Sequence, residues 1–205
     1  MRQFIPSPTC LALAGVLSAS VLATPAQAQA VFNADPSTLG AIPDSVGECG
    51  GDGLPLFVSV PVTGAVGGVT SVAVNMVLSH TWMGEITATL ISPDGTAHVL
   101  FGRTRAVTPT DWGSDNDLIN TPVSFSDAAT GNWWTAALTN PVPGGAYRTT
   151  AIGGFPGANG PATAMNPVFD NREPNGTWLV RFTDSCRLDV GAVSALSISL
   201  TTTGI

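Results

Sequence analysis

Residues 69–101 read VTSVAVNMVLSHTWMGEITATLISPDGTAHVLF, and this stretch decides the fold. Apolar residues alternate with other residues over 69–79 and again over 85–92, a pattern that is typical of strands with one buried face. The run SPDGT at 92–96 predicts a turn, because Pro fixes φ and Gly readily adopts a positive φ. Residues 97–101 then form the return arm of a hairpin, so the stretch predicts antiparallel β-structure.

Further strands are predicted on both sides of this stretch. They cover residues 54–62, 122–126, 177–183 and 190–203. Pro55 and Pro61 suit an edge strand or the ends of a strand. No window keeps a helical period over three turns, so we expect an all-β fold, a jelly-roll β-sandwich.

Composition excludes several classes of protein. The 205 residues include 14 Asp and Glu, 7 Arg and no Lys, which gives a formal net charge of −7. An acidic chain without lysine lacks the positive charge that nucleic-acid backbones require. The 23 Gly and 16 Pro oppose a helix bundle, and the apolar content is too high for a disordered chain.

The N-terminus resembles a secretory signal peptide, predicted over residues 1–30. Arg2 is its one charged side chain, residues 10–24 are apolar or small, and the AQAQA run at 26–30 offers a cleavage site after Ala28 or Ala30. No later apolar stretch reaches the ~18 residues that a membrane span needs. We therefore expect a secreted or periplasmic protein with no membrane span after signal removal.

The two cysteines outside the signal peptide fit an exported protein. Cys49 and Cys186 form an even pair in an oxidising compartment, which predicts one structural disulfide, with two free thiols as the alternative.

Two segments carry a resemblance to a known family. SHTWMGEITATLISPDGT at 79–96 is similar to the H-T-aromatic-x-G-acid segment and its S-P-x-G-T turn in the P domain, also called the P/Homo B domain. NGTWLVRFTD at 175–184, continued by DVG at 189–191, is similar to the ending of that domain, and IPD at 42–44 to its opening. The matching residues are His80, Thr81, Trp82, Gly84, Glu85, Pro93, Gly95, Asn175, Gly176, Thr177, Trp178, Asp184 and Gly191.

The resemblance implies a galactose-binding-like jelly-roll β-sandwich over residues 41–203, after a short lead-in at 31–40. Residues 102–175 would form a long loop-rich insertion. In this family the domain accompanies the catalytic domain of subtilisin-like proteases such as kexin and furin, supports its folding and stability, and is not itself catalytic. This chain contains no such catalytic domain, has Glu85 where Asp is usual, and has Leu196 where the last strand often carries Trp.

The residues also argue against catalysis in this chain. Only His80 and His98 could act as a base, and no G-x-S-x-G segment is present. His80 belongs to the family motif, for which we expect a packing or hydrogen-bonding role. We therefore predict that the chain is not an enzyme.

Calcium is the one cofactor that the sequence suggests. Residues 112–117 (WGSDND) place carboxylate and amide oxygens at Asp115, Asn116 and Asp117, and Asp111 and Asp127 could add ligands. The alternative is a loop held by Asx turns. Asp184 and Asp189 could form a second, weaker cation site, although turn chemistry is the simpler interpretation there.

The main functional hypothesis is an exported, non-catalytic accessory module that binds another protein, such as an exported protease. The alternative is a glycan- or surface-binding module, because Trp112, Trp133 and Trp134 lie in irregular segments where indole rings could face a ligand.

Overall fold

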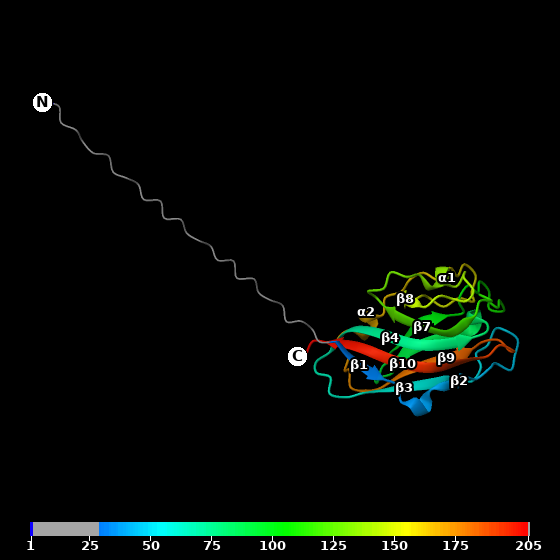
Figure 1. Cartoon of the computed structure of the whole chain (residues 1–205), viewed down its shortest axis with the longest axis horizontal. Helices are drawn as coiled ribbons and strands as arrows, with labels where there is room; N and C mark the ends of the chain where they lie inside the picture. Colours follow the sequence, from blue (N-terminus) through cyan, green and yellow to red (C-terminus); the bar gives the residue numbers. More distant parts are fainter. Residues whose placement is uncertain (2–28, 205) are drawn as a thin grey trace.

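The chain folds into two packed β-sheets with very little helix (Figure 1). The computed structural model describes Met1 and residues 29–204. The predicted all-β sandwich is confirmed, and the galactose-binding-like, jelly-roll subtype stays a prediction. Most of the predicted signal peptide, residues 2–28, lies outside the described residues.

The larger sheet has the strand order β1-β10-β4-β7-β8, with β2 also paired to β10. All its pairs are antiparallel except β7 and β8, which run parallel. Its strands are β1 (Gln29–Asn33), β2 (Gly40–Ile42), β4 (Val69–His80), β7 (Leu118–Ser126), β8 (Gly145–Tyr147) and β10 (Gly191–Thr202).

The smaller sheet has the order β3-β9-β5-β6 and is antiparallel throughout. Its strands are β3 (Leu56–Val62), β5 (Ile86–Ile91), β6 (Ala97–Gly102) and β9 (Gly176–Asp184). β3 is an edge strand that pairs with β9 alone, as its prolines predicted. The described residues also form four short helical turns: η1 (Pro36–Thr38), η2 (Met83–Glu85), α1 (Trp133–Ala136) and α2 (Asn166–Phe169).

The alternating apolar side chains meet between the two sheets. Val74 and Leu78 from β4 and Val180 from β9 are fully buried in one continuous core. Phe101 of β6 stacks on Phe125 of β7, with ring centroids 5.2 Å apart, so the aromatic contact joins one sheet to the other. The period of two in the sequence therefore places one face of each long strand in the core.

Residues 102–175 belong to the sandwich and are more than a loop-rich excursion. They supply β7 and β8 to the larger sheet, and β7 starts four residues earlier than predicted. Trp133 and Phe169 from this segment are fully buried in the core. The segment lacks a clear periodicity because its aromatic side chains fill the core from short turns.

A strand begins at the predicted cleavage region, and the boundary of the signal peptide stays a prediction. β1 begins at Gln29, where Gln29 lies opposite Thr201 of β10. Residues 29 and 30, which the sequence assigned to the signal peptide, and the first residues of the predicted lead-in therefore form an edge strand of the larger sheet. Among the described residues, no helix is long and apolar enough to cross a membrane.

Candidate functional site

A buried polar cluster lies at one end of the sandwich, where the two motif segments meet. His80 ends β4, Glu85 ends η2 at the start of β5, and Asp184 ends β9. The three side chains come from both sheets, and they offer ligand atoms that all lie within 4.8 Å of one another. Residues more than 100 positions apart in the chain thus form one site.

His80 is held by hydrogen bonds at both ring nitrogens. The backbone N–H of Trp82 donates to Nδ1 at 3.0 Å, so Nδ1 carries no proton. The Nε2–H therefore donates to Oδ2 of Asp184 at 3.1 Å, and both side chains are fully buried. Oδ1 of Asp184 in turn accepts the backbone N–H of Cys186. This geometry agrees with the hydrogen-bonding role expected for His80. The bond from His80 to Asp184 connects the larger sheet to the smaller one.

Glu85 has no such partners. Its side chain is fully buried, and neither Oε1 nor Oε2 forms a hydrogen bond. Burial raises the pKa of this carboxyl to about 8, and the nearby carboxylates of Asp184, Asp189 and Asp44 act in the same direction against the guanidinium of Arg103. An unpartnered buried carboxyl is costly, so this residue marks the cluster as a candidate site.

Glycines allow the backbone to close around this cluster. A Cβ on Gly191 would meet the ring of His80 and the carbonyl oxygen of Ser79, and a Cβ on Gly84 would meet the backbone of residues 112–114. The backbone N–H of Gly84 donates to Ser114 O at 2.9 Å. The glycines of the family motif thus bring a neighbouring loop and strand into direct contact with the site.

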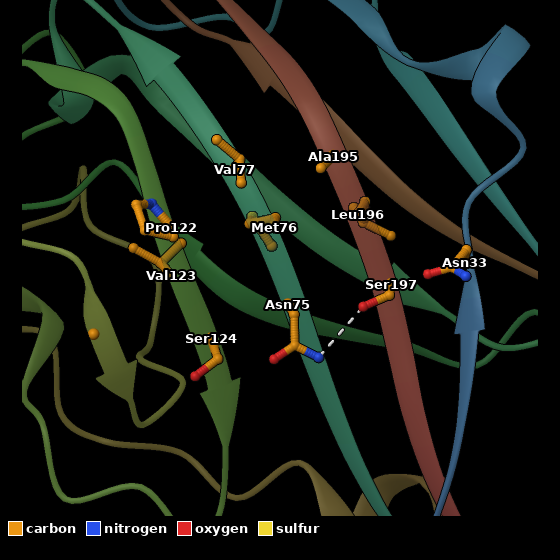
Figure 2. Close-up of a pocket in the computed structure, with 11 residues that line it drawn as sticks. Asn33, Asn75, Met76, Val77, Pro122, Val123, Ser124, Ala195, Leu196 and Ser197 are labelled. Carbon is orange, nitrogen blue, oxygen red and sulfur yellow. Dashed lines mark hydrogen bonds between the residues drawn. The ribbon is translucent and has the colours of Figure 1, made fainter.

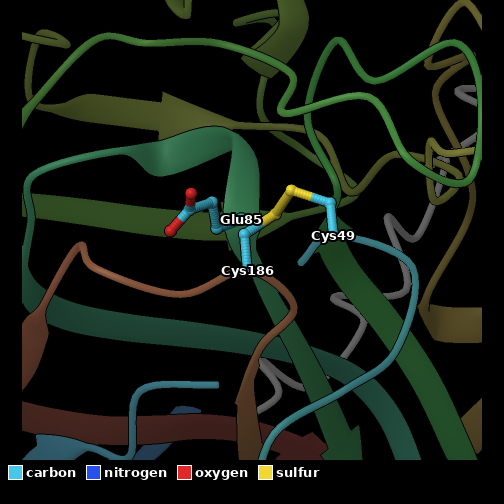
Figure 3. Close-up of side chains that lie close together, drawn as sticks. All are labelled: Cys49, Glu85 and Cys186. Carbon is cyan, nitrogen blue, oxygen red and sulfur yellow. A yellow bond between two sulfur atoms is a disulfide. The ribbon is translucent and has the colours of Figure 1, made fainter. Parts of the chain in front are cut away.

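The disulfide lies beside Glu85 (Figure 3). Cys49 and Cys186 are bonded, as predicted, and a carboxylate oxygen of Glu85 lies within 4.8 Å of both sulfur atoms. Because both sulfurs are used in the bond, they offer no thiolate to a metal ion.

A cavity of about 330 Å³ lies near the cluster and contains Arg103. The guanidinium donates to the carbonyl oxygens of Pro109 and Asp111, while its buried Nε has no partner. Asp52 accepts a hydrogen bond from Ser185 at the same cavity. Arg103 could not be predicted from the sequence, because it lies between regular strands where no pattern indicates a role.

A second hollow lies on the outer face of the larger sheet, between β7, β4 and β10 (Figure 2). This groove has a volume of about 380 Å³ and is bordered by Asn33 of β1. Asn75 lies at its centre, where Nδ2 donates weakly to Ser197 Oγ at 3.5 Å. No Asp, Glu, Arg or Lys occurs in any of the six described strands of this sheet.

The four aspartates predicted to bind calcium do not form a shared ligand group. Among the described residues, two groups of three His, Cys, Asp or Glu side chains place ligand atoms within 4.8 Å, and both contain Glu85. Neither group includes any of the four predicted residues, which are Asp111, Asp115, Asp117 and Asp127.

Two of these aspartates hold the backbone instead. Asp111 accepts the N–H groups of Val107 and Gly113, which lowers the pKa of its carboxyl. Asp127 uses both carboxylate oxygens to accept the N–H groups of Met165 and Asn166 at the start of α2. The contact between Asp111 and the N–H of Gly113, two residues on, is the bonding that the Asx-turn alternative describes, whereas Asp127 bonds a segment far along the chain. Calcium binding in this loop stays a prediction.

The tryptophans proposed to face a ligand are placed differently. Trp133 is fully buried against Phe101 and donates from Nε1 to Thr104, and Trp134 is 7% exposed. The expectation that these two rings could bind a glycan is therefore wrong, because they fill the core. Trp112 is half-buried and packs edge-on against Trp82.

A comparison with family models agrees with the first of the two motif segments, residues 79–96. Residues 69–139 match the family model described as the proprotein convertase P-domain, which confirms the resemblance over this stretch. No curated protein matches the chain.

Two solved structures of a serine protease resemble the chain. The crystal structure of the serine protease of Aeromonas sobria has 16% sequence identity and a TM-score of 0.44, over 88% of this chain and 28% of the protease chain. The complex of that protease with its chaperone gives the same identity and TM-score, over 87% of this chain and 27% of the other. This chain thus spans less than a third of either relative.

Proposed function

We propose that this protein is an exported, non-catalytic accessory module that binds a subtilisin-like protease. The match of residues 69–139 to the P-domain family carries this proposal, because domains of that family accompany such proteases. The matched range contains β4 and β7, two of the five strands that line the groove.

The outer face of the larger sheet is the surface that suits a protein partner best. The chain has 14 acidic residues and 7 arginines, yet the six described strands of this sheet contain none of them. The cores of protein interfaces are depleted in charged residues, because desolvating a charge is costly. Exposed Pro122 and Ala195 and half-buried Ser124 and Ser197 instead present small, uncharged groups around the groove.

Photo-crosslinking in the exporting cell tests both the face and the partner. A benzophenone amino acid replaces Ala195 on the larger sheet, and a matched variant carries it at Thr177, which is exposed on β9 of the smaller sheet. We expect position 195, and not position 177, to crosslink to a subtilisin-like protease that mass spectrometry identifies. Equal crosslinking at both positions, or a partner unrelated to proteases, would contradict the proposal.

A further inference from the structure

We propose that Glu85 and Asp184 bind one calcium ion inside the end of the sandwich, at a place distinct from the acidic loop that the sequence suggested. Glu85 is fully buried, and neither of its carboxylate oxygens has a hydrogen bond. Buried carboxylates are normally paired, hydrogen-bonded or bound to a metal ion. A cation beside Glu85 supplies the missing partner.

The spacing of the donor atoms suits a single ion. Carboxylate oxygens of Glu85 and Asp184 lie within 4.8 Å of each other. Calcium binds oxygen ligands at about 2.3 to 2.6 Å, so one ion can contact both carboxylates across this distance. Water molecules would complete the coordination, since calcium takes about six to eight oxygen ligands.

The other side chains at the site favour calcium over zinc. Nδ1 of His80 accepts the N–H of Trp82, and its Nε2–H points at Asp184, so the ring has no free lone pair for a metal ion. Cys49 and Cys186 are joined in a disulfide. Only oxygen donors remain, and an all-oxygen site selects a hard cation such as calcium. His80 then orients the carboxylate of Asp184 through the hydrogen bond from its Nε2–H.

The surrounding charges also attract a cation. Asp189 and Asp44 lie close enough to act on the charge of Glu85, and Arg103 is the one described basic side chain that opposes them. Asp189 accepts from Thr81, and Asp44 accepts from the backbone of Leu188, so both carboxylates are fixed near the cluster. Two cavities reach this region: one is lined by Arg103 and Ser185, and the other by His80 and Thr81.

Calcium titration of the EDTA-treated protein tests the site. We expect calorimetry to show one bound calcium ion, and the melting temperature to rise by about 5 to 10 °C at a calcium concentration 100 times the Kd. Glu85→Gln keeps the shape of the side chain and removes its charge. It should weaken binding at least tenfold and reduce the rise in melting temperature at the same calcium concentration by about half or more. In EDTA this variant should melt at or above the temperature of the wild type, because its amide replaces a buried, unpartnered carboxyl.

The matched control changes the acidic loop instead. Asp115→Asn combined with Asp117→Asn should keep both the binding and the rise in melting temperature. The proposal is overturned if the wild type binds no calcium at millimolar concentration, if Glu85→Gln binds as tightly as the wild type, or if only the loop variant loses binding.

A measurement on the wild type keeps the test independent of how the variants fold. Anomalous scattering from a crystal soaked in terbium chloride should place an ion in contact with the carboxylates of Glu85 and Asp184. An ion found only in the loop at 111–117, or no ion at all, would refute the site.

Discussion

At the residue scale, close backbone contacts decide what position 84 tolerates. A Cβ added to Gly84 would lie 2.7 Å from the carbonyl carbon of Gly113 and closer still to Ser114 N and Trp112 O. These are backbone atoms in a hydrogen-bonded loop, so they cannot move aside cheaply. We expect Gly84→Ala to lower the free energy of unfolding by about 3 kcal/mol or more in urea denaturation.

Gly47 provides the control for this substitution. A Cβ there meets nothing within 4 Å, and its φ is not positive. Gly47→Ala should change the free energy of unfolding by about 0.5 kcal/mol or less. Equal effects at the two positions would mean that the contact between η2 and the 112–114 loop does not hold the site together.

His98 gives the fold a dependence on pH. Burial lowers the pKa of His98 from 6.5, with Asp127 opposing the shift, while Nε2 lies 3.1 Å from Thr149 Oγ1. The unfolded chain therefore takes up a proton at this residue at a higher pH than the folded chain does. The stability that the uncharged ring contributes is present above pH 6.5 and is lost as the pH falls below that value.

Chemical denaturation of the wild type and His98→Gln at several pH values checks this effect. As the pH falls from 7.5 to 5, the free energy of unfolding of the wild type should decrease more than that of His98→Gln. Glutamine does not titrate in this range, so all other groups cancel in the comparison. A difference that stays constant across the range would show that His98 does not titrate differently on folding.

The motif residues of the buried cluster could be predicted from the sequence, but their chemistry could not. His80, Glu85 and Asp184 all fall in segments that resemble the P domain. Glu85 lacks a hydrogen-bond partner for two reasons. One is the register of β5 against β9, where Ile86 lies opposite Asp184, and the other is the packing of the loop with Gly113 over η2. An alternating pattern of apolar residues predicts neither the strand register nor the packing of the loop.

At the scale of elements, the disulfide ties the end of β9 to the segment before β3. Cys49 and Cys186 are 137 residues apart in the chain, so the bond closes a long loop in the unfolded state. The loop-entropy model gives a stabilisation of about 4 to 5 kcal/mol for a loop of this length. We expect the double substitution Cys49→Ser with Cys186→Ser to lower the melting temperature by about 10 °C or more.

Mass spectrometry and thermal melting check this prediction together. The unreduced wild type should be two hydrogens lighter than the reduced chain, because one S–S bond replaces two S–H bonds. Reduction of the wild type should give the same loss of melting temperature as the double substitution. Labelling of both cysteines in the untreated protein would contradict the structure.

Long strands were predictable, and short ones were not. β4, β5 and β9 alternate apolar and other residues clearly, and their bounds agree with the sequence to within one or two residues. β2 and β8 have three residues each, too few to show a period, and they exist because β10 and β7 offer them an edge to pair with. Pairing of this kind is set by tertiary contacts and not by local sequence.

At the scale of the whole molecule, the described strands of both sheets contain few or no charged residues. The larger sheet has no Asp, Glu, Arg or Lys in its described strands, whereas β9 of the smaller sheet contains Arg181 and Asp184. The acidic residues therefore lie mostly in the loops and at the sheet ends, where they keep the surface solvated. This distribution leaves one broad uncharged face for a partner and concentrates negative charge around the buried cluster.

The arrangement of both histidines predicts that the protein is not a peptidase. A serine peptidase needs a nucleophile beside a base that substrate can reach. Both ring nitrogens of His80 are engaged, by Trp82 and Asp184, and its side chain is fully buried. His98 contacts Thr149, a hydroxyl that is itself fully buried, so no substrate carbonyl could approach it.

We therefore expect the purified protein neither to hydrolyse casein nor to react with a fluorophosphonate probe. Subtilisin assayed in parallel serves as the positive control, and the heat-denatured protein gives the background. Probe labelling above that background would contradict this expectation. If the labelling disappeared in His98→Gln, His98 would be the base of an activated nucleophile. Nonspecific labelling would not change on substitution of this half-buried residue. That result would reverse the proposed role, since the module would then carry out the chemistry that we assign to its partner.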